Sequence, residues 1–208
     1  MVGLAANDAS VGLVFAPREI LATGPDAAAW IAEFGRPHEH FDGLQPINEG
    51  RALMWQILDA GFENWIGEPS SVLISRAALE SVGLFNPRLK QLSDLELWIR
   101  ISLRFRVGFL ERTLSAYRHH DLSASAESTA TGDDWLEPLW LAESHVVANR
   151  NGPQQARLAS LRNRRLLQAL KTQLIRLAHG HLDADLVDYY RYRLRPENGS
   201  RTLHPTLD

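Results

Sequence analysis

The sequence of 208 residues contains no cysteine. A disulfide framework, a zinc–thiolate centre and a cysteine nucleophile are therefore all excluded. Long apolar runs are absent too, and none approaches the ~20 residues that a membrane-spanning helix needs. The first ten residues lack the basic region and the long apolar core of a secretory signal peptide. These absences predict a cytoplasmic protein, with peripheral contact at the inner face of the membrane as an open alternative.

Charge is distributed unevenly, although the net charge is only −3. Residues 151–208 contain 10 Lys and Arg against 5 Asp and Glu, whereas residues 1–150 contain 12 against 20. Such a basic tail could contact an anionic surface, and the alternative is an ordinary solvated helix face. The sequence Asn-Gly-Pro at 151–153 indicates a linker. We therefore predict a body of residues 1–150 and an amphipathic helical extension of residues 151–208 with a frayed end.

Hydrophobic patterning predicts an α/β fold. Short apolar runs of the kind found in buried strands occupy residues 11–16, 72–74 and 106–110. Helical spacing, with Ser or Gly at several ends, occupies residues 26–34, 51–60, 77–82, 94–105 and 133–149. In the tail helix, apolar side chains are expected on one side: Ala159, Leu166, Leu167, Leu170, Leu174 and Leu177.

The segment Ser93-Asp94-Leu95-Glu96 opens one of these helices and allows two interpretations. Ser93 at the cap and Glu96 three residues later form the pattern of a capping box. Asp94, at the mouth of the helix just after a loop, is also well placed to face a cleft. There it could take a proton from a hydroxyl group. The spacing alone leaves both interpretations open.

Four motifs in a fixed order resemble the acceptor-side half of inverting family 2 glycosyltransferases, which have the GT-A fold. They are Gly-Glu-Pro-Ser-Ser-Val at 67–72, Val-Gly-Leu-Phe at 82–85 after Arg76, Ser-Asp-Leu-Glu-Leu-Trp-Ile-Arg at 93–100, and Tyr-Arg-His-His at 117–120 followed by Ser123 and Ser125. The resemblance covers roughly residues 5–125. It implies a partial GT-A, Rossmann-like sheet with flanking helices. It also implies sugar transfer, with inversion, from a nucleotide-sugar donor to a hydroxyl of a saccharide or lipid-linked acceptor.

Site residues follow from this resemblance position by position. Asp94 aligns with the general base of the family, and Glu96 is the rival acid. Ser93 departs from the family, which commonly has an acid there. Trp98 and Glu68 are assigned to substrate binding, although a solvated loop acid is the alternative for Glu68.

The last motif implies contacts with the leaving group. Arg118 takes the place of an arginine near the donor diphosphate, because a guanidinium matches a phosphate. His120 takes the place of a histidine near the Mn²⁺ or Mg²⁺ ion, because a neutral imidazole is a common metal ligand. Without the resemblance, both residues and His119 would be ordinary surface residues.

The donor-binding half of the family is missing from this sequence, including the Asp-x-Asp motif that follows a strand. Asp183 and Asp185 match that motif in letters only, because they lie in the tail. His38 and His40, in a Pro- and Gly-flanked loop, are a weak metal candidate. The sequence thus predicts a truncated or incomplete enzyme, or one completed by a partner chain. The alternative is a non-catalytic assembly module that pairs with another chain or docks through its basic helix. Nucleic acid is disfavoured because no aromatics are interleaved with those cations.

Overall fold

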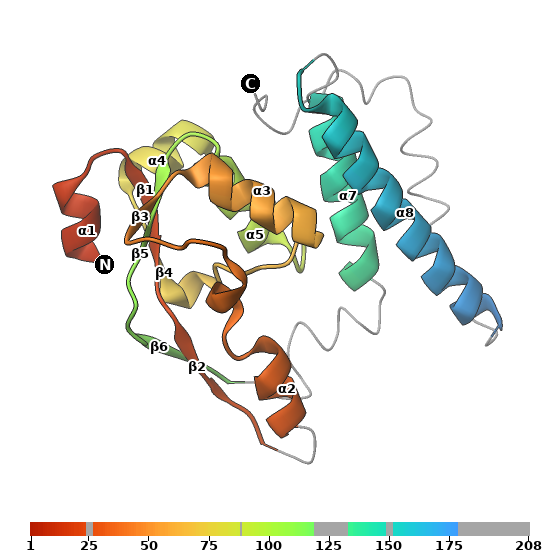
Figure 1. The fold of residues 1–208 in the computed structure, drawn as a ribbon, viewed down its shortest axis with the longest axis horizontal. Helices are drawn as coiled ribbons and strands as arrows, with labels where there is room; N and C mark the ends of the chain where they lie inside the picture. The colour runs from red at the N-terminus through yellow and green to blue at the C-terminus, as the bar shows by residue number, and fades with distance from the viewer. Residues whose placement is uncertain (24–26, 88, 119–132, 149–151, 179–208) are drawn as a thin grey trace. The chain divides into compact units, whose positions relative to one another are not determined.

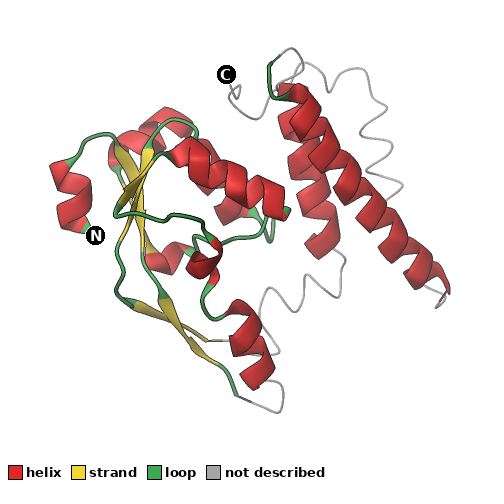
Figure 2. Ribbon diagram, viewed as in Figure 1, coloured by secondary structure: helices red, strands yellow, loops and turns green. Residues whose placement is uncertain are grey.

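The computed structural model describes residues 1–23, 27–87, 89–118, 133–148 and 152–178. The chain divides into two compact units, residues 1–126 and residues 127–208. The first unit combines helices and strands, and the second contains two long helices (Figure 1, Figure 2). The predicted α/β fold is confirmed. Every helix in the described ranges is too short or too polar to cross a bilayer.

A four-stranded sheet forms the core of the first unit, in the order β3-β5-β1-β4. Strand β1 (Val11–Phe15) pairs in parallel with β5 (Arg106–Phe109) and antiparallel with β4 (Val72–Ile74). Strand β3 (Ile47–Asn48) pairs antiparallel with β5. All five residues of β1 are buried, which explains why this strand is an unbroken apolar run rather than an alternating one. Strands β1, β4 and β5 coincide with the three that the sequence predicts.

A proline separates this sheet from a second sheet of two strands. Because Pro17 has no N–H to donate, the ladder of β1 is interrupted at that residue. Pairing resumes between β2 (Arg18–Leu21) and β6 (Ser115–Arg118), which are parallel. The N–H of Leu114 also donates to the Pro17 carbonyl oxygen at 3.3 Å. The segments that form β1 and β5 therefore continue side by side as β2 and β6 (Figure 1).

Helix α5 (Ser93–Ser102) is the central helix of this unit. It contacts β1 and also helices α3 (Gly50–Ala60) and α4 (Arg76–Val82). Its eight consecutive residues from Leu95 to Ser102 are all buried. The first residue of α3 is a glycine because a Cβ there would lie 2.3 Å from the carbonyl oxygen of Ser102. Close packing around α5 thus fixes the helix that carries Asp94.

The helix ends match the sequence predictions in two places and differ in a third. Ser75 Oγ accepts a backbone N–H at 3.1 Å and caps α4. Gly61, with a φ of 99°, ends α3 in the left-handed conformation. The capping box, one of the two interpretations open for the start of α5, does not form. Leu92 occupies the cap position without a side-chain hydrogen bond, and Glu96 turns into the core.

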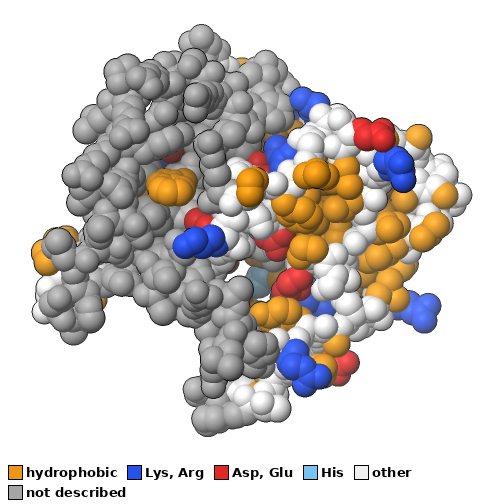
Figure 3. Space-filling model, turned by 180° about the vertical axis from the view of Figure 1, so that it is seen from behind, with side chains coloured by type: hydrophobic (Ala, Val, Ile, Leu, Met, Phe, Trp, Pro, Cys, Tyr) orange, Lys and Arg blue, Asp and Glu red, His pale blue; other side chains and the backbone are white. Residues whose placement is uncertain are grey.

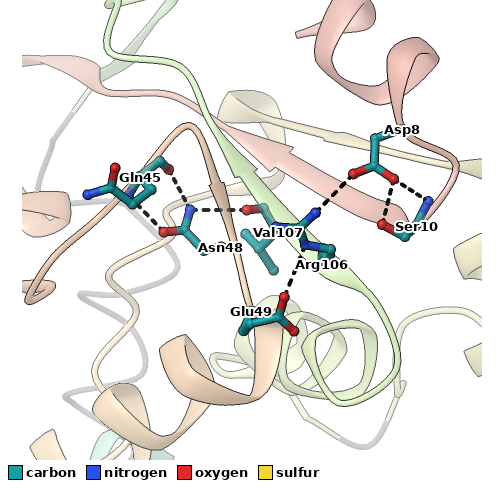
Figure 4. A network of polar contacts seen from close by, with 7 residues as sticks. All are labelled: Asp8, Ser10, Gln45, Asn48, Glu49, Arg106 and Val107. Atoms are coloured by element: carbon teal, nitrogen blue, oxygen red, sulfur yellow. Dashed lines mark hydrogen bonds and ion pairs between the residues drawn. The ribbon is translucent and has the colours of Figure 1, made fainter.

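Shorter elements complete the unit: α1 (Val2–Asn7), α2 (Ala27–Phe34) and the 3₁₀ turns η1 (Pro37–His40) and η2 (Pro69–Ser71). A polar network fastens the starts of β1 and β5 (Figure 4). The guanidinium of Arg106 lies 3.2 Å from the carboxylates of both Asp8 and Glu49. The side-chain amide of Asn48 donates to the Val107 carbonyl oxygen at 3.1 Å. These contacts connect β3, one of the two edge strands, to β5.

The second unit is a pair of packed helices, α7 (Asp133–Ala148) and α8 (Gln155–Ala178). Leu139 and Ala169 are fully buried between them, with Trp140 and Leu166 packed alongside. Helix α7 was expected to belong to the body of the protein. The boundary predicted at residue 150 instead falls between the two helices of one unit, because α7 buries its apolar side chains against α8.

Candidate functional site

Asp94 lies in the first turn of α5 and is partly buried. One carboxylate oxygen, Oδ1, accepts the backbone N–H of Leu95 at 2.6 Å. The other, Oδ2, accepts the side-chain amide of Asn64 at 3.0 Å. A negative charge at this end of a helix is also stabilised by the helix dipole. Both oxygens are therefore held by donors, and the carboxylate has one defined orientation.

Asn64 also closes the turn that ends at Gly67. Its Oδ1 accepts the N–H of Gly67 at 3.0 Å, and its Nδ2 donates to the Gly67 carbonyl oxygen at 3.2 Å. Gly67 has a φ of +105°, a conformation that favours glycine. The sequence analysis missed Asn64, although an asparagine three residues before a glycine is a typical turn signal. Asn64 therefore positions both the turn and the carboxylate of Asp94.

Trp98, one turn along α5 from Asp94, fastens the same turn from the other side. Its indole N–H donates to the Gly67 carbonyl oxygen at 3.0 Å. The side chain is fully buried, with 0% exposed. The assignment of Trp98 to substrate binding is therefore corrected, because a side chain with no exposed surface cannot contact a substrate. It anchors the loop before η2 to the helix that carries Asp94.

Burial, with a smaller contribution from the negative charge of Glu68, raises the pKa of Asp94 to about 6. The hydrogen bonds from the Leu95 backbone and from Asn64 lower the pKa and offset part of this rise. A carboxylate with a pKa of about 6 is still ionised at neutral pH, yet it is more basic than an exposed one. These are the properties that a general base requires.

Glu68 lies directly after the turn and forms an ion pair. Its Oε2 is 2.7 Å from Nε of Arg18, and the two side chains are 27% and 9% exposed. The guanidinium of Arg18 also lies over the ring of Tyr117, 5.9 Å from its centroid. Glu68 is therefore not the solvated loop acid of the alternative interpretation. The structure brings Glu68 and Asp94 together, and it connects them to strands β2 and β6.

Glu96, the alternative candidate for the general base, is buried in the core. It is 2% exposed, and its two carboxylate oxygens accept Nε and Nη2 of Arg100 at 2.6 and 2.7 Å. Arg100 donates as well to the carbonyl oxygens of Val82 and Leu84 at the end of α4. Helix ends leave such carbonyl groups without intrahelical partners. Glu96 and Arg100 therefore join α5 to α4, and Asp94 is the acid of α5 that remains at the site.

The remaining predicted residues lie at or beyond the end of β6. Arg118 is the last residue of that strand, and its side chain is exposed. His119, His120 and the two serines after them lie outside the described residues. The fit of Arg118 and His120 to a diphosphate and its metal therefore stays a prediction.

Aromatic rings surround the turn on the side of Trp65, which follows Asn64. Trp65 contacts His40 in a tilted arrangement, with 5.4 Å between ring centroids, and meets Phe41 edge-on at 5.2 Å. His38 stacks instead on Phe109 at 5.6 Å, and burial lowers its pKa. The two imidazoles thus contact different rings, which argues against the His38–His40 metal candidate.

The residues that the structure describes include no group of three or more His, Asp or Glu arranged to hold a metal ion. His120, the residue that the resemblance assigns to the Mn²⁺ or Mg²⁺ ion, lies outside these residues, so the metal stays a prediction.

The chain is similar to an uncharacterized protein, MT1568, of Mycobacterium tuberculosis (strain CDC 1551 / Oshkosh). The two are 38% identical over 124 residues, which cover 59% of this chain and 37% of that relative. The chain thus spans little more than a third of the relative's length. No protein-family model and no solved structure matches the chain.

Proposed function

We propose that this chain is the acceptor-side half of an inverting, family 2-like glycosyltransferase and that Asp94 is its general base. The observation that carries the proposal is the state of the Asp94 carboxylate. It is partly buried, oriented by two hydrogen bonds, and shifted to a pKa of about 6. A fully exposed acid in this first turn would interact favourably with the helix dipole without the cost of burial.

In the proposed step, the acceptor hydroxyl oxygen attacks the anomeric carbon of the donor sugar. A new carbon–oxygen bond forms, and the bond from that carbon to the diphosphate oxygen breaks on the opposite face. The nucleoside diphosphate leaves with the electron pair, and the hydroxyl proton passes to Asp94. The sugar configuration is thereby inverted. Asn64 orients the carboxylate through its hydrogen bond, and the negative charge of Glu68 raises the pKa of Asp94.

The proposed substrates are a nucleotide sugar and a saccharide or lipid-linked acceptor. Glu68 is part-exposed beside Asp94, and we assign it to acceptor binding together with its partner Arg18. Arg118, exposed at the end of β6, is assigned to the donor diphosphate. Both assignments rest on charge: a carboxylate accepts sugar hydroxyls, and a guanidinium matches phosphate.

A donor-binding half would have to come from sequence outside this chain, in a longer protein or in a partner. The α/β unit offers apolar surface for such a contact. Large exposed apolar side chains include Val2 (71%), Leu84 (72%) and Phe85 (42%), and hydrophobic side chains gather on the face of this unit seen in Figure 3. Strand β4 is also an edge strand whose three apolar residues are only part-buried. Exposed apolar patches and open edges of this kind mark contact surfaces.

Calorimetric titration with a nucleoside diphosphate and Mn²⁺ tests whether this chain holds donor-site residues. Saturable binding that the His120→Ala variant loses would support the assignment of the Tyr117–His120 segment to the donor. Absence of binding by a folded chain would remove His120 from the donor site, and transfer would then be assayed with the donor half added.

The role of Asp94 is tested by transfer assays that compare Asp94→Asn with Asp42→Asn, a control at an exposed acid. We expect Asp94→Asn to lose transfer by at least a hundredfold, in the range of general-base contributions. The control is expected to keep the wild-type rate. An unchanged rate in Asp94→Asn would refute the assignment of the base.

A further inference from the structure

Helix α8 has an unusual charge pattern that the proposed function does not use. Over its 24 residues it contains no Asp or Glu. Its basic residues are Arg157, Arg162, Arg164, Arg165, Lys171 and Arg176. One of these cations is used within the unit, because Arg162 pairs with Glu143 of α7 at 3.0 Å. Arg164 and Lys171 are exposed and can face a ligand outside the chain.

Large apolar side chains are exposed on the same helix. Ala169, which is 1% exposed, packs on Leu139 of α7, with Leu166 alongside. Leu158 and Leu161 of α8 are also buried. Three leucines that the helical spacing predicts on the apolar face are instead exposed: Leu167, Leu174 and Leu177. We define the α8 stripe as the four exposed apolar residues of the C-terminal half of the helix: Leu167 (68%), Leu174 (68%), Ile175 (52%) and Leu177 (53%).

Cations and apolar residues run in adjacent rows along α8. Arg164 and Lys171 are seven residues apart, as are Leu167 and Leu174. Residues at this spacing lie nearly on one line along a helix. Lys171 is four residues after Leu167 and three before Leu174, so it lies on the same face as both. An exposed helix face that combines leucines with cations and contains no acid is typical of helices that bind at membrane surfaces.

We propose that the α8 stripe docks the protein on the surface of a bilayer that contains anionic phospholipids. The leucines enter the boundary between headgroups and acyl chains, while Arg164 and Lys171 stay at the level of the phosphates. A nucleic acid would use the cations but leave the leucines in water. A second copy of α8 would bring like charges together beside the apolar contact. The proposal is independent of the proposed transferase activity.

Flotation of the full chain with lipid vesicles tests this proposal. One set of vesicles contains equal parts of phosphatidylcholine and phosphatidylglycerol, and the other contains phosphatidylcholine alone. We expect binding to the anionic set only, and we expect that binding to fall as salt is added. The double variant Leu167→Gln/Leu174→Gln should weaken it by about tenfold per leucine. Arg164→Gln/Lys171→Gln should weaken it by about fivefold per cation.

The matched control is Val2→Gln/Leu84→Gln, which replaces two equally exposed apolar residues of the other unit and should bind as the wild type does. Circular dichroism establishes that each variant keeps its helices. No flotation of the folded wild type, or equal flotation with both vesicle sets, would overturn the proposal. Unchanged flotation of the leucine variant would overturn it as well. A wild-type dimer that the leucine variant dissociates, without vesicle binding, would assign the α8 stripe to a second copy.

Discussion

The raised pKa of Asp94 predicts a specific dependence of stability on pH. Asp94→Asn removes the titrating group at almost constant size. A rise of the pKa from 3.8 to about 6 means that ionised Asp94 opposes folding. In free energy of unfolding, a shift of this size corresponds to about 3 kcal/mol.

The sign follows from linkage between protonation and folding. The pKa of Asp94 is higher in the folded protein than in the unfolded chain, so the folded state binds the proton more tightly. The resulting stability is fully present below the unfolded pKa, near 3.8, and is lost as the pH rises through about 6. The Asp94→Asn variant has no titrating group at this position, so it does not lose this stability as the pH rises. Relative to the wild type, the variant should therefore gain about 3 kcal/mol between about pH 4 and about pH 7.

Urea unfolding at a series of pH values measures this difference. Any constant offset, such as the altered hydrogen bond to Asn64, leaves the slope unchanged, so the difference between the two curves isolates the titration of Asp94. Asp42→Asn, at an exposed acid, serves as the control and should follow the wild-type curve. A flat difference between wild type and Asp94→Asn would refute the reasoning, because it would mean that folding does not shift the pKa of this carboxyl group.

Three further substitutions test the surroundings of Asp94. Asn64→Ala should lower the free energy of unfolding by about 1–3 kcal/mol, because Asp94 and the turn lose a half-buried hydrogen-bond partner. It should also raise the pKa of Asp94 measured by carbon-13 NMR, and an unchanged pKa would contradict the role of Asn64. Glu68→Gln should lower that pKa, because it removes a neighbouring negative charge; a rise would be the opposite of what we expect. Arg100→Met should cost about 3–5 kcal/mol in urea unfolding, because Glu96 stays buried without its cation. The double variant Glu96→Met/Arg100→Met should recover much of that loss, and equal losses in the two would show that the ion pair is not the cause.

Three of the four strands of the main sheet could be predicted, because β1, β4 and β5 are short apolar runs that need no partner to be recognised. The two-residue strand β3 was missed, because it is too short to form such a run. Strands β2 and β6 were missed, since each mixes Arg with apolar residues and is held by pairing with a segment almost a hundred residues away. Short alternating stretches of this kind do not reveal their partners.

The position of Asp94 at the start of α5 follows from local spacing, but most of its contacts do not. Its hydrogen bond to Asn64 joins residues 30 positions apart, which no local pattern encodes. Glu96 has a cation four residues later, a spacing that allows an ion pair on one helix face. The sequence also allows Glu96 to form a capping box with Ser93. In the structure Glu96 is buried, and a buried carboxylate requires a charged partner, so the ion pair with Arg100 forms instead.

The burial of Leu95–Ser102 in α5 has a consequence for how the site can change over evolutionary time. A helix segment enclosed on all sides opens only when the whole unit unfolds, so its amide hydrogens should be among the slowest to exchange with solvent. Asp94 directly precedes this segment and accepts the backbone N–H of Leu95, its first residue. Gly67 is constrained as well, because it has a positive φ and a Cβ there would lie 2.8 Å from the hydroxyl oxygen of Ser71. The exposed positions of strand β6 can accept new side chains. Surface residues beside the site can thus diverge between related proteins while the position of the carboxylate remains tied to global stability.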